Sequence, residues 1–384
     1  MKYCLKAGQL YCPEEVMPNA SLFVEESGNI AKIERSGKEA GEVIDLSPYK
    51  VIPGLIELHI HGVKGHDTMD ANFHALDGMS QHLARNGVTA FLAATVTSNY
   101  ENTLTAVKNV AHCTERGLAG AMLLGSYLEG PYIGSKYKGA HPEEHIRSLE
   151  LTEIEELIVA SRNTIRVAAL APEKPQVTEA IKYLKSKGIK IAIGHSDATY
   201  TQAMAAIEAG ANIAVHTFNG MRSLHHREPG ILGAILTNDQ IMAEVIADGV
   251  HVAQPIIEIL CRCKSWKNII LVSDSIRAGG LADGEHLLGE MKVLVKDGVA
   301  RIESGSLAGS TLRLMDAVRF MYENMKVPLL EAVHMASINP AASLGIDDVT
   351  GSIHKDKRAD LVAIDENFNV VFSMVNGRIV YDQR

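Results

Sequence analysis

The central part of the chain repeats one pattern, in which a short apolar run rich in β-formers is followed by a segment with helical periodicity. The runs are apolar at nearly every position, which is typical of parallel strands buried on both faces. The amphipathic segments between them include LTEIEELIVASR and QVTEAIKYLKSKG. The eight runs are GLIELHI, VTAFLAAT, AMLLGSYLE, TIRVAALA, IKIAIGH, ANIAVHT, IMAEVIA and NIILVSD.

Eight strand–helix units predict an α/β fold, namely a closed (β/α)8 barrel of the TIM type. Gly188 and Gly210 follow two of the predicted helices, where a left-handed C-cap favours glycine. An open, doubly wound sheet is the alternative architecture. It normally carries a G-x-G-x-x-G turn after its first strand, and the chain has no such motif.

The two ends of the chain have a different sequence pattern from its centre. Short alternating stretches (SLFVEE, IAKIER, VIDLS) near the start, and DLVAIDENFNVVFSMVNGRIVY near the end, predict antiparallel strands, with Asn-Gly as a hairpin signal. We therefore expect one small β domain built from residues 1–52 plus 350–384, and a barrel over residues 53–349. After the eighth run, the sequence around 287–303 predicts an inserted β-hairpin that turns at Asp297-Gly298.

Amino-acid composition limits which binding partners and which cellular compartment we expect for the chain. The chain of 384 residues is 46% hydrophobic and 22% charged, as in ordinary soluble proteins, and its formal charge of -9 comes without a basic block. This balance argues against nucleic acid or an anionic membrane as the main partner. The N-terminus lacks the apolar core of a signal peptide, and no run reaches the ~18 residues of a membrane span. Five cysteines then predict reduced thiols in a cytoplasmic protein.

Polar side chains stand where the predicted strands end. The C-terminal ends of barrel strands build the active site, and potential metal ligands close five of these eight runs. Each such residue alone has an ordinary structural explanation, such as a helix cap or an ion pair, but five coincident strand ends predict a shared site. These residues are His59 and His61 after the first run, Glu129 after the third, His195 after the fifth, His216 after the sixth and Asp274 after the eighth.

Five segments together resemble the amidohydrolase superfamily and, within it, the family of N-acetylglucosamine-6-phosphate deacetylases. They are PGLIELHIHG, LEGPYI, GHSDA, HTFNGMR and VSDS, and an Arg six residues after the Met of HTFNGM is the most specific feature. The resemblance spans almost the whole chain, up to the terminal VNGRIVY. It implies a barrel with a small β-sandwich domain, and hydrolysis of the acetamide of N-acetylglucosamine-6-phosphate to glucosamine-6-phosphate and acetate.

The resemblance also implies a metal centre. It assigns Glu129, His195 and His216 to a principal divalent ion, and it matches His59 and His61 to the ligands of a second ion that only some members bind. One or two ions are therefore expected, with Glu129 bridging them if both are present. Imidazole and carboxylate ligands suit Zn, Fe, Ni or Mn.

Amide hydrolysis requires an activated water and a proton for the departing nitrogen. A metal ion lowers the pKa of bound water from ~15.7 towards ~7. Asp274 is the candidate for moving the proton from water to the amine, and His141 is the candidate for a hydrogen bond to the developing oxyanion.

The substrate contacts are expected from the resemblance. Arg227 matches the family's phosphate-binding arginine, whose planar fork suits phosphate. A homodimer is also implied, which leaves open the subunit that supplies Arg227 and His251 to a given site. The remaining expected contacts are Ala140, His141, Asn219, Gly220, His251, Leu307, Ala308 and Gly309.

Two other functions compete with this interpretation. A cyclic-amide hydrolase of the dihydroorotase or dihydropyrimidinase kind would use a carboxylated lysine at the end of the fourth strand. Lys174 lies near that place, but it follows Glu173 outside the run, so we expect it to be solvated. A non-catalytic barrel that serves as a scaffold should have lost ligands, and none of the six motif positions is missing.

Overall fold

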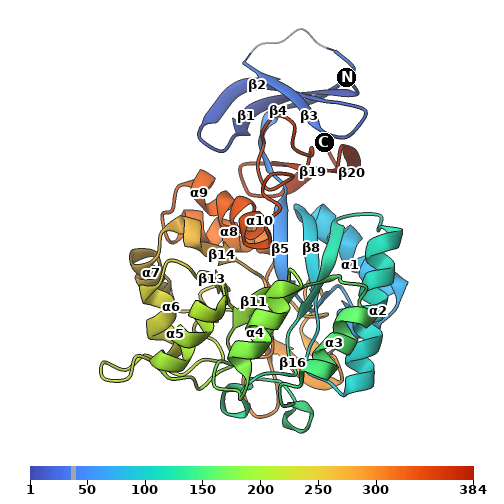
Figure 1. The fold of residues 1–384 in the computed structure, drawn as a ribbon. Coiled ribbons are helices and arrows are strands. Elements are labelled where there is room, and N and C mark those ends of the chain that lie inside the picture. Colours follow the sequence, from blue (N-terminus) through green and yellow to red (C-terminus); the bar gives the residue numbers. More distant parts are fainter. Residues whose placement is uncertain (36–39) are drawn as a thin grey trace.

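The computed structural model describes residues 1–35 and 40–384, and Figure 1 shows a barrel with a smaller sheet above it. Eight parallel strands form the barrel, one for each apolar run. The (β/α)8 expectation is therefore confirmed. The barrel strands are β5 (Leu55–Ile60), β8 (Val88–Ala94), β9 (Met122–Leu128), β10 (Ile165–Leu170), β11 (Lys190–Ile193), β12 (Ile213–Ala214), β13 (Met242–Val245) and β14 (Ile269–Leu271).

The barrel closes where its first and last strands meet. The strand order is β14-β13-β12-β11-β10-β9-β8-β5, so each strand pairs with its neighbour in the chain. Beyond β14, the Asp274 N–H donates to the His59 carbonyl at 2.9 Å, and the His61 N–H donates to the Ser275 carbonyl at 2.9 Å. These bonds lie just past the strand ends, so the seam of the barrel passes beside the predicted ligands.

Alternation along the strands explains why the runs are apolar throughout. Ile56 and Leu58 belong to the core inside the barrel, whereas Leu55 packs in the core between the strands and the helices. Because successive side chains point to opposite faces, a strand that is covered on both faces needs apolar residues at every position.

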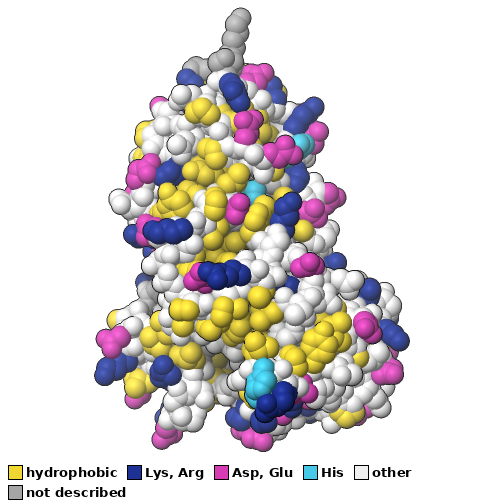
Figure 2. Space-filling model, turned by 90° about the vertical axis from the view of Figure 1, so that its left-hand side faces the viewer, with side chains coloured by type: hydrophobic (Ala, Val, Ile, Leu, Met, Phe, Trp, Pro, Cys, Tyr) yellow, Lys and Arg dark blue, Asp and Glu magenta, His cyan; other side chains and the backbone are white. Residues whose placement is uncertain are grey.

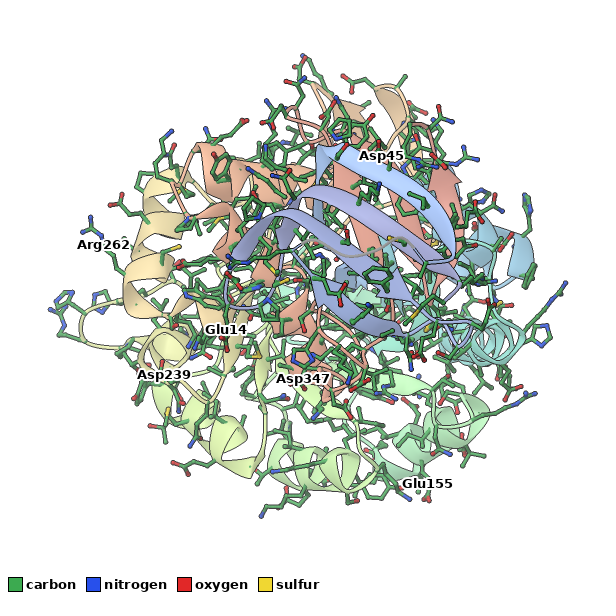
Figure 3. The ribbon with its side chains drawn as sticks, turned by 90° about the horizontal axis from the view of Figure 1, so that it is seen from above. Glu14, Asp45, Glu155, Asp239, Arg262 and Asp347 are labelled. Atoms are coloured by element: carbon green, nitrogen blue, oxygen red, sulfur yellow. The ribbon has the colours of Figure 1, made fainter. Side chains whose placement is uncertain are left out.

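Helices surround the strands, and Figure 3 shows them as a ring when the barrel is seen from the side of the small sheet. Local signals fix several helix ends. Thr199 and Gln202 form a capping box at the start of α5, and Asn99 accepts a hydrogen bond from the Asn102 N–H at the start of α2. The helices are α1 (Phe73–Arg85), α2 (Tyr100–Arg116), α3 (Leu151–Ala160), α4 (Val177–Ser186), α5 (Tyr200–Ala209), α6 (Gly230–Thr237), α7 (Gln254–Cys263), α8 (Leu314–Glu323), α9 (Leu329–His334) and α10 (Ile338–Leu344), with short 3-10 turns at Thr68–Asp70, Ser135–Tyr137, Glu143–His145 and Trp266–Asn268.

The two ends of the chain join in one seven-stranded sheet with its own apolar core. Its order is β20-β19-β18-β4-β1-β2-β3, and the hairpin expected at Asn376-Gly377 is present between β19 and β20. One detail of the prediction was wrong, because β1 pairs with β4 in parallel. The strands are β1 (Tyr3–Tyr11), β2 (Val16–Val24), β3 (Ile30–Glu34), β4 (Glu42–Pro53), β18 (Leu361–Ile364), β19 (Val370–Val375) and β20 (Arg378–Asp382).

The inserted segment after β14 forms three antiparallel strands where the sequence predicted one hairpin. They are β15 (Gly284–Leu288), β16 (Met291–Lys296) and β17 (Val299–Arg301). The predicted turn at Asp297-Gly298 is present, with positive φ at both residues, and a second turn adds β15. A short pair, β6 (Gly62–Val63) and β7 (His66–Asp67), follows β5.

The direction of β5 decides where the site lies. The chain descends from the terminal sheet through β4 into β5, so the strand C-termini lie at the barrel end away from that sheet, beside β16 (Figure 1). Within the described part of the chain, no helix combines the length and the apolar character needed to cross a membrane.

Candidate metal centre and active site

Glu129 stands at the middle of the predicted constellation. Its Oε1 atom lies 3.2 Å from His195 Nε2 and 3.0 Å from His216 Nε2. Its Oε2 atom lies 3.3 Å from the Nε2 atoms of both His61 and His141. All five side chains are buried. Residues from four distant stretches of the chain therefore meet around one carboxylate.

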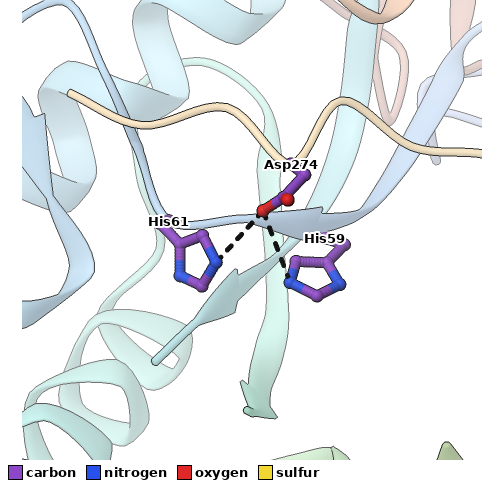
Figure 4. A group of neighbouring side chains, drawn as sticks. All are labelled: His59, His61 and Asp274. Carbon is purple, nitrogen blue, oxygen red and sulfur yellow. Dashed lines mark ion pairs between the residues drawn. The ribbon is translucent and has the colours of Figure 1, made fainter. Parts of the chain in front are cut away.

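His59 and Asp274 complete the cluster on its other side. Figure 4 shows the carboxylate of Asp274 facing His59, near the end of β5, and His61, which directly follows β5. Asp274 Oδ1 lies 3.2 Å from His61 Nε2 and 3.8 Å from His59 Nε2, and His59 Nε2 is also 3.5 Å from Glu129 Oε1. His59 lies in β5 and His61 directly follows that strand, and the Nε2 atoms of both face the same carboxylate oxygen.

The outer ring nitrogens indicate how the inner ones are protonated. His195 Nδ1 lies 2.9 Å from the Tyr137 carbonyl, and His216 Nδ1 lies 3.2 Å from the Asn219 carbonyl. Because a carbonyl only accepts, each Nδ1 carries the proton and each Nε2 presents a lone pair. These two lone pairs point at Glu129 Oε1, which is itself an acceptor.

Acceptors that converge without a proton between them fit a cation. His59 Nε2 is buried and has no hydrogen-bond partner among the described residues. Burial lowers the pKa of His59, but the carboxylates of Glu129, Glu244 and Asp274 raise it well above its ordinary value. The cluster thus favours positive charge at its centre, and its nitrogen and carboxylate donors are those that divalent transition metals accept. The residues present fit a metal ion.

The protein backbone is held in unusual conformations at three of these positions. His195, His216 and Asp274 have φ of 42°, 25° and 50°, which non-glycine residues rarely adopt. Such strain persists where the surrounding structure imposes it, and it is concentrated at functional sites. Close packing also restricts Gly220, since a Cβ atom there would lie 2.7 Å from His195 Nδ1.

His141 is held as a neutral hydrogen-bond donor. The Thr97 N–H donates to His141 Nδ1 at 3.2 Å, so the ring proton resides on Nε2, which faces Glu129. Burial, which outweighs the attraction of Glu129, lowers the pKa of His141 to about 4. The imidazole is therefore uncharged near neutral pH and can still donate a hydrogen bond from Nε2.

The cluster lies at the base of a cavity of about 310 Å³. His251 stands in its wall between two acceptors, with Nδ1 2.7 Å from Asp248 Oδ2 and Nε2 3.2 Å from the Gly309 carbonyl. Burial lowers the pKa of His251, but Asp248 and, more weakly, Asp274 raise it above its ordinary value. Ala308 is buried and does not line the cavity, although its neighbours do. The expected substrate contacts that line it are Ala140, His141, Asn219, Gly220, His251, Leu307 and Gly309.

Comparison with known proteins agrees with this geometry. The amidohydrolase family matches residues 50–380. The chain belongs to this family. It is 42% identical to an N-acetylglucosamine-6-phosphate deacetylase of Vibrio furnissii, over 99% of this chain and 95% of that protein. It is also 42% identical to an N-acetylgalactosamine-6-phosphate deacetylase of Escherichia coli O157:H7, over 99% of both chains. A structure of N-acetyl-D-glucosamine-6-phosphate deacetylase from Mycobacterium smegmatis in complex with N-acetyl-D-glucosamine-6-phosphate superposes with a TM-score of 0.93, at 30% identity and 99% coverage of both chains.

One expected substrate residue of this amidohydrolase lies away from the cavity. Arg227 is exposed in the loop before α6, which extends outward at the lower left of Figure 1. Its guanidinium contacts His226 Nε2 at 2.7 Å. Within the single chain, Arg227 does not line the cavity.

Lys174 differs from the expectation of a solvated side chain. It is half-buried, its Nζ donates to the Arg147 carbonyl at 2.9 Å, and burial lowers its pKa. The expectation was wrong because the loop after β10 folds back against residue 147. Lys174 does not line the cavity, whereas Glu129 does.

Sequence reasoning missed several side chains that support the amidohydrolase site. Glu57 and Glu244 interrupt two otherwise apolar runs, and a charge in a strand buried on both faces is a signal that could have identified them. Glu57 accepts hydrogen bonds from the backbone N–H groups of His59 and Ser273, and burial raises its pKa to about 7. Thr97 carries no comparable signal, because an ordinary loop threonine looks the same in sequence.

Proposed function

We propose that this amidohydrolase removes the acetyl group from N-acetylglucosamine-6-phosphate, producing glucosamine-6-phosphate and acetate. The observation that carries the proposal is the convergence of Glu129 with His195 and His216, beside Asp274, at the base of a cavity. The full-length similarity to deacetylases of phosphorylated N-acetyl sugars supports the choice of substrate.

The proposed cofactor is a divalent ion, which we expect to be Zn, Fe, Ni or Mn. Glu129, His195 and His216 would hold the principal ion, and His59 and His61 would contribute to a second one, with Glu129 between the two sets. When bound, such an ion supplies Lewis-acid polarisation of a carbonyl and a lower pKa for water.

Asp274 is the proposed proton carrier. Burial raises its pKa, but the hydrogen bond and charge of His61 and the charge of His59 lower it to about 2, so it is a carboxylate at neutral pH. It can accept the proton of the attacking water and then deliver it to the amide nitrogen as the C–N bond breaks. The oxygen of water ends on the acetyl carbon, giving acetate, and the proton carried by Asp274 ends on the nitrogen, giving the amine of glucosamine-6-phosphate.

His141 is the proposed donor to the oxygen of the former carbonyl group. Its neutral ring, with the proton on Nε2, can donate to a developing negative charge without losing that proton. Thr97 fixes this tautomer, so the donor is oriented before the substrate arrives.

Recognition of the phosphate is proposed to involve His251 and Arg227. His251 has an acceptor at each ring nitrogen and a raised pKa, so its charged form is favoured in the cavity wall. Arg227 lies outside its own cavity, which suits its delivery to the site of a second copy in a homodimer. Figure 2 shows hydrophobic side chains gathered on the face of the molecule that it views, and Val250, Ile256 and Ile259, on and before α7, are exposed hydrophobic residues; both observations support such a dimer.

N-acetylgalactosamine-6-phosphate is the second candidate substrate. The relative named as its deacetylase is as similar to this chain as the N-acetylglucosamine-6-phosphate deacetylase, at 42% identity each. The two sugars differ only in the configuration of one hydroxyl. They present the same acetamide and phosphate groups to the residues described above.

The decisive experiment measures acetate release from both phosphorylated sugars, with and without a chelator. We expect turnover with N-acetylglucosamine-6-phosphate that a chelator abolishes and added metal restores. A higher kcat/KM for the galactose epimer would favour the second candidate. Turnover of dihydroorotate, with none of either sugar, would contradict the proposal in favour of a cyclic-amide hydrolase.

The domain organisation is part of the proposal. The terminal sheet and the barrel each have an apolar core, which supports a small β domain of residues 1–52 plus 350–384 and a catalytic barrel of residues 53–349. The five cysteines are free thiols, which suits the reducing cytoplasm that we propose as its location.

A further inference from the structure

Glu244 is a fully buried carboxylate in the interior of the barrel. It lies on β13, between Ala243 and Val245, which face the helices, so its own side chain points inward. No lysine or arginine forms an ion pair with it among the described residues. Burying a charge is costly unless a partner compensates it, so the partner of this carboxylate identifies its role.

The imidazole of His59 contacts the Glu244 carboxylate, and the backbone N–H of His216 also donates to Glu244 Oε2 at 3.3 Å. His59 Nδ1 lies 3.4 Å from Glu244 Oε2, and this is the only ring nitrogen in contact with the carboxylate in the described chain. The Tyr127 hydroxyl donates to the same oxygen at 3.5 Å, and the Tyr127 ring packs 4.5 Å from the His59 ring. Glu244 thus holds the Nδ1 edge of the His59 ring, and the Tyr127 ring packs against it.

The contact between Glu244 and His59 Nδ1 determines which ring nitrogen of His59 faces the centre. With Glu244 accepting at Nδ1, the proton resides there, and the unpartnered Nε2 of His59 points its lone pair at the centre between Glu129 and Asp274. His61, which directly follows β5, has a buried Nδ1 that finds no hydrogen-bond partner among the described residues. His59 differs from it, because a carboxylate contacts its outer nitrogen.

Glu244 does not itself belong to the centre. The described side chains whose ligand atoms lie within 4.8 Å of one another are His59 with His61 and Asp274, and Glu129 with His141 and His195. Glu244 is on the far side of the His59 ring from both groups. Its effect on the centre must therefore pass through the side chain of His59 and the backbone of His216, whose N–H donates to Glu244 Oε2 at 3.3 Å.

We propose that Glu244 is a positioning residue that orients His59, makes it a stronger ligand, and so determines whether the His59 and His61 side of the centre holds its own ion. The inference rests on the metal centre proposed above. A carboxylate that accepts from the outer nitrogen of a ligating histidine fixes its tautomer and raises its basicity, and losing it typically weakens metal binding ~10–100-fold.

The test titrates metal-stripped protein with Zn²⁺ and records bound Zn²⁺ per chain and the Tm. For Glu244→Met, which removes both charge and acceptor, we expect the weaker Zn²⁺ site to lose affinity by ~10–100-fold and the tighter site to stay. Glu244→Gln keeps an acceptor and should fall between wild type and Glu244→Met. Should Glu244→Met fail to fold, Glu244→Gln decides the question alone.

Two controls separate positioning from general stability. The metal-free Tm of Glu244→Met should fall, because the Tyr127 hydroxyl and the His216 N–H lose their buried acceptor, and the Zn²⁺-induced rise above that metal-free Tm should also be smaller than in the wild type. Ser126→Ala removes another fully buried polar group from the barrel and should change neither Zn²⁺ binding nor the rise in Tm. In a double-mutant cycle, Glu244→Met should add nothing to His59→Gln.

Equal Zn²⁺ stoichiometry and affinity in wild type and Glu244→Met would overturn the inference, and so would a lower metal-free Tm with unchanged Zn²⁺ binding. A wild-type chain that binds one ion regardless of residue 244 would also overturn it. These outcomes are independent of the substrate: loss of one Zn²⁺ in a chain without deacetylase activity would contradict the proposed function alone. Full activity with unaltered Zn²⁺ binding would contradict only the role of Glu244.

Discussion

The strand ends and the loop before α6 hold their polar side chains in opposite ways. At the strand ends, Glu129 and Asp274 are buried among histidines whose outer nitrogens are fixed by carbonyls, a backbone N–H or a carboxylate. In the loop, Arg227 is exposed, and its hydrogen bonds within the described chain are with His225 and His226. The strand ends therefore hold their polar groups in place within one chain, whereas Arg227, the proposed phosphate-binding group, is not held at the cavity of its own chain.

The comparison has a kinetic consequence. Side chains that act on the reacting atoms in the transition state should affect kcat, and a group that holds the distant phosphate equally in both states should affect KM. The following substitutions test whether that division holds.

Asp274→Asn should have the largest effect. The amide cannot accept the proton of the attacking water, so we expect kcat for acetate release to fall ~10²–10⁴-fold, with metal content largely intact. Turnover and metal analysis on the same preparation provide the measurement. Loss of the metal together with activity would instead make Asp274 mainly a ligand.

His141→Gln should lower kcat by ~10²–10³-fold with little change in KM, which is the usual cost of removing one donor to an oxyanion. His145→Gln is the matched control, because His145 follows in the same segment and does not line this cavity. Equal effects of the two substitutions would remove His141 from the chemistry.

Arg227→Ala should raise KM for the phosphorylated sugar by ~10–100-fold and leave kcat nearly unchanged, since a hydrogen bond to a charged group contributes ~1.5–3 kcal/mol. Arg162→Ala, an exposed arginine paired with Glu115, serves as the control. Mixing Arg227→Ala with Asp274→Asn subunits sharpens the comparison: partial activity at the wild-type KM would mean that the loop serves the partner's cavity. If Arg227→Ala leaves KM unchanged, the loop before α6 does not bind the phosphate, and the assignment of kcat to the strand ends and KM to the loop fails.

The pH dependence of KM tests the cavity wall. Burial lowers the pKa of His251 and Asp248 raises it above the ordinary 6.5, with Asp274 adding to the rise, so the ring gains a proton on folding. Its contribution to stability and to anion binding is fully present below pH 6.5 and is lost as pH rises through the folded pKa. We expect KM to rise ~2–10-fold over that interval. In His251→Gln the same titration should be flat, and a persistent rise would assign it to another group.

Lys174→Met should have the smallest effect, changing kcat by less than about twofold. The side chain donates to the Arg147 carbonyl and does not line the cavity that holds Glu129. Loss of metal and activity in this variant would indicate a carboxylated lysine ligand. That result would favour a cyclic-amide hydrolase over a deacetylase of phosphorylated N-acetyl sugars.

The amino-acid sequence alone determined the strands and the identity of their terminal residues. Both follow from local rules, because a run buried on both faces must be apolar and the ends of parallel strands meet at one edge. The hairpin at Asn376-Gly377 was predictable for the same reason, since its turn geometry depends on two adjacent residues.

The tertiary structure alone decided which nitrogen of each histidine faces the centre. Thr97 selects the tautomer of His141 and Glu244 that of His59, and these pairs come from segments far apart in the chain. It also decided that Arg227 lies outside its own cavity. Tautomer, orientation and burial depend on groups that meet only when the barrel closes, so no local pattern of residues encodes them.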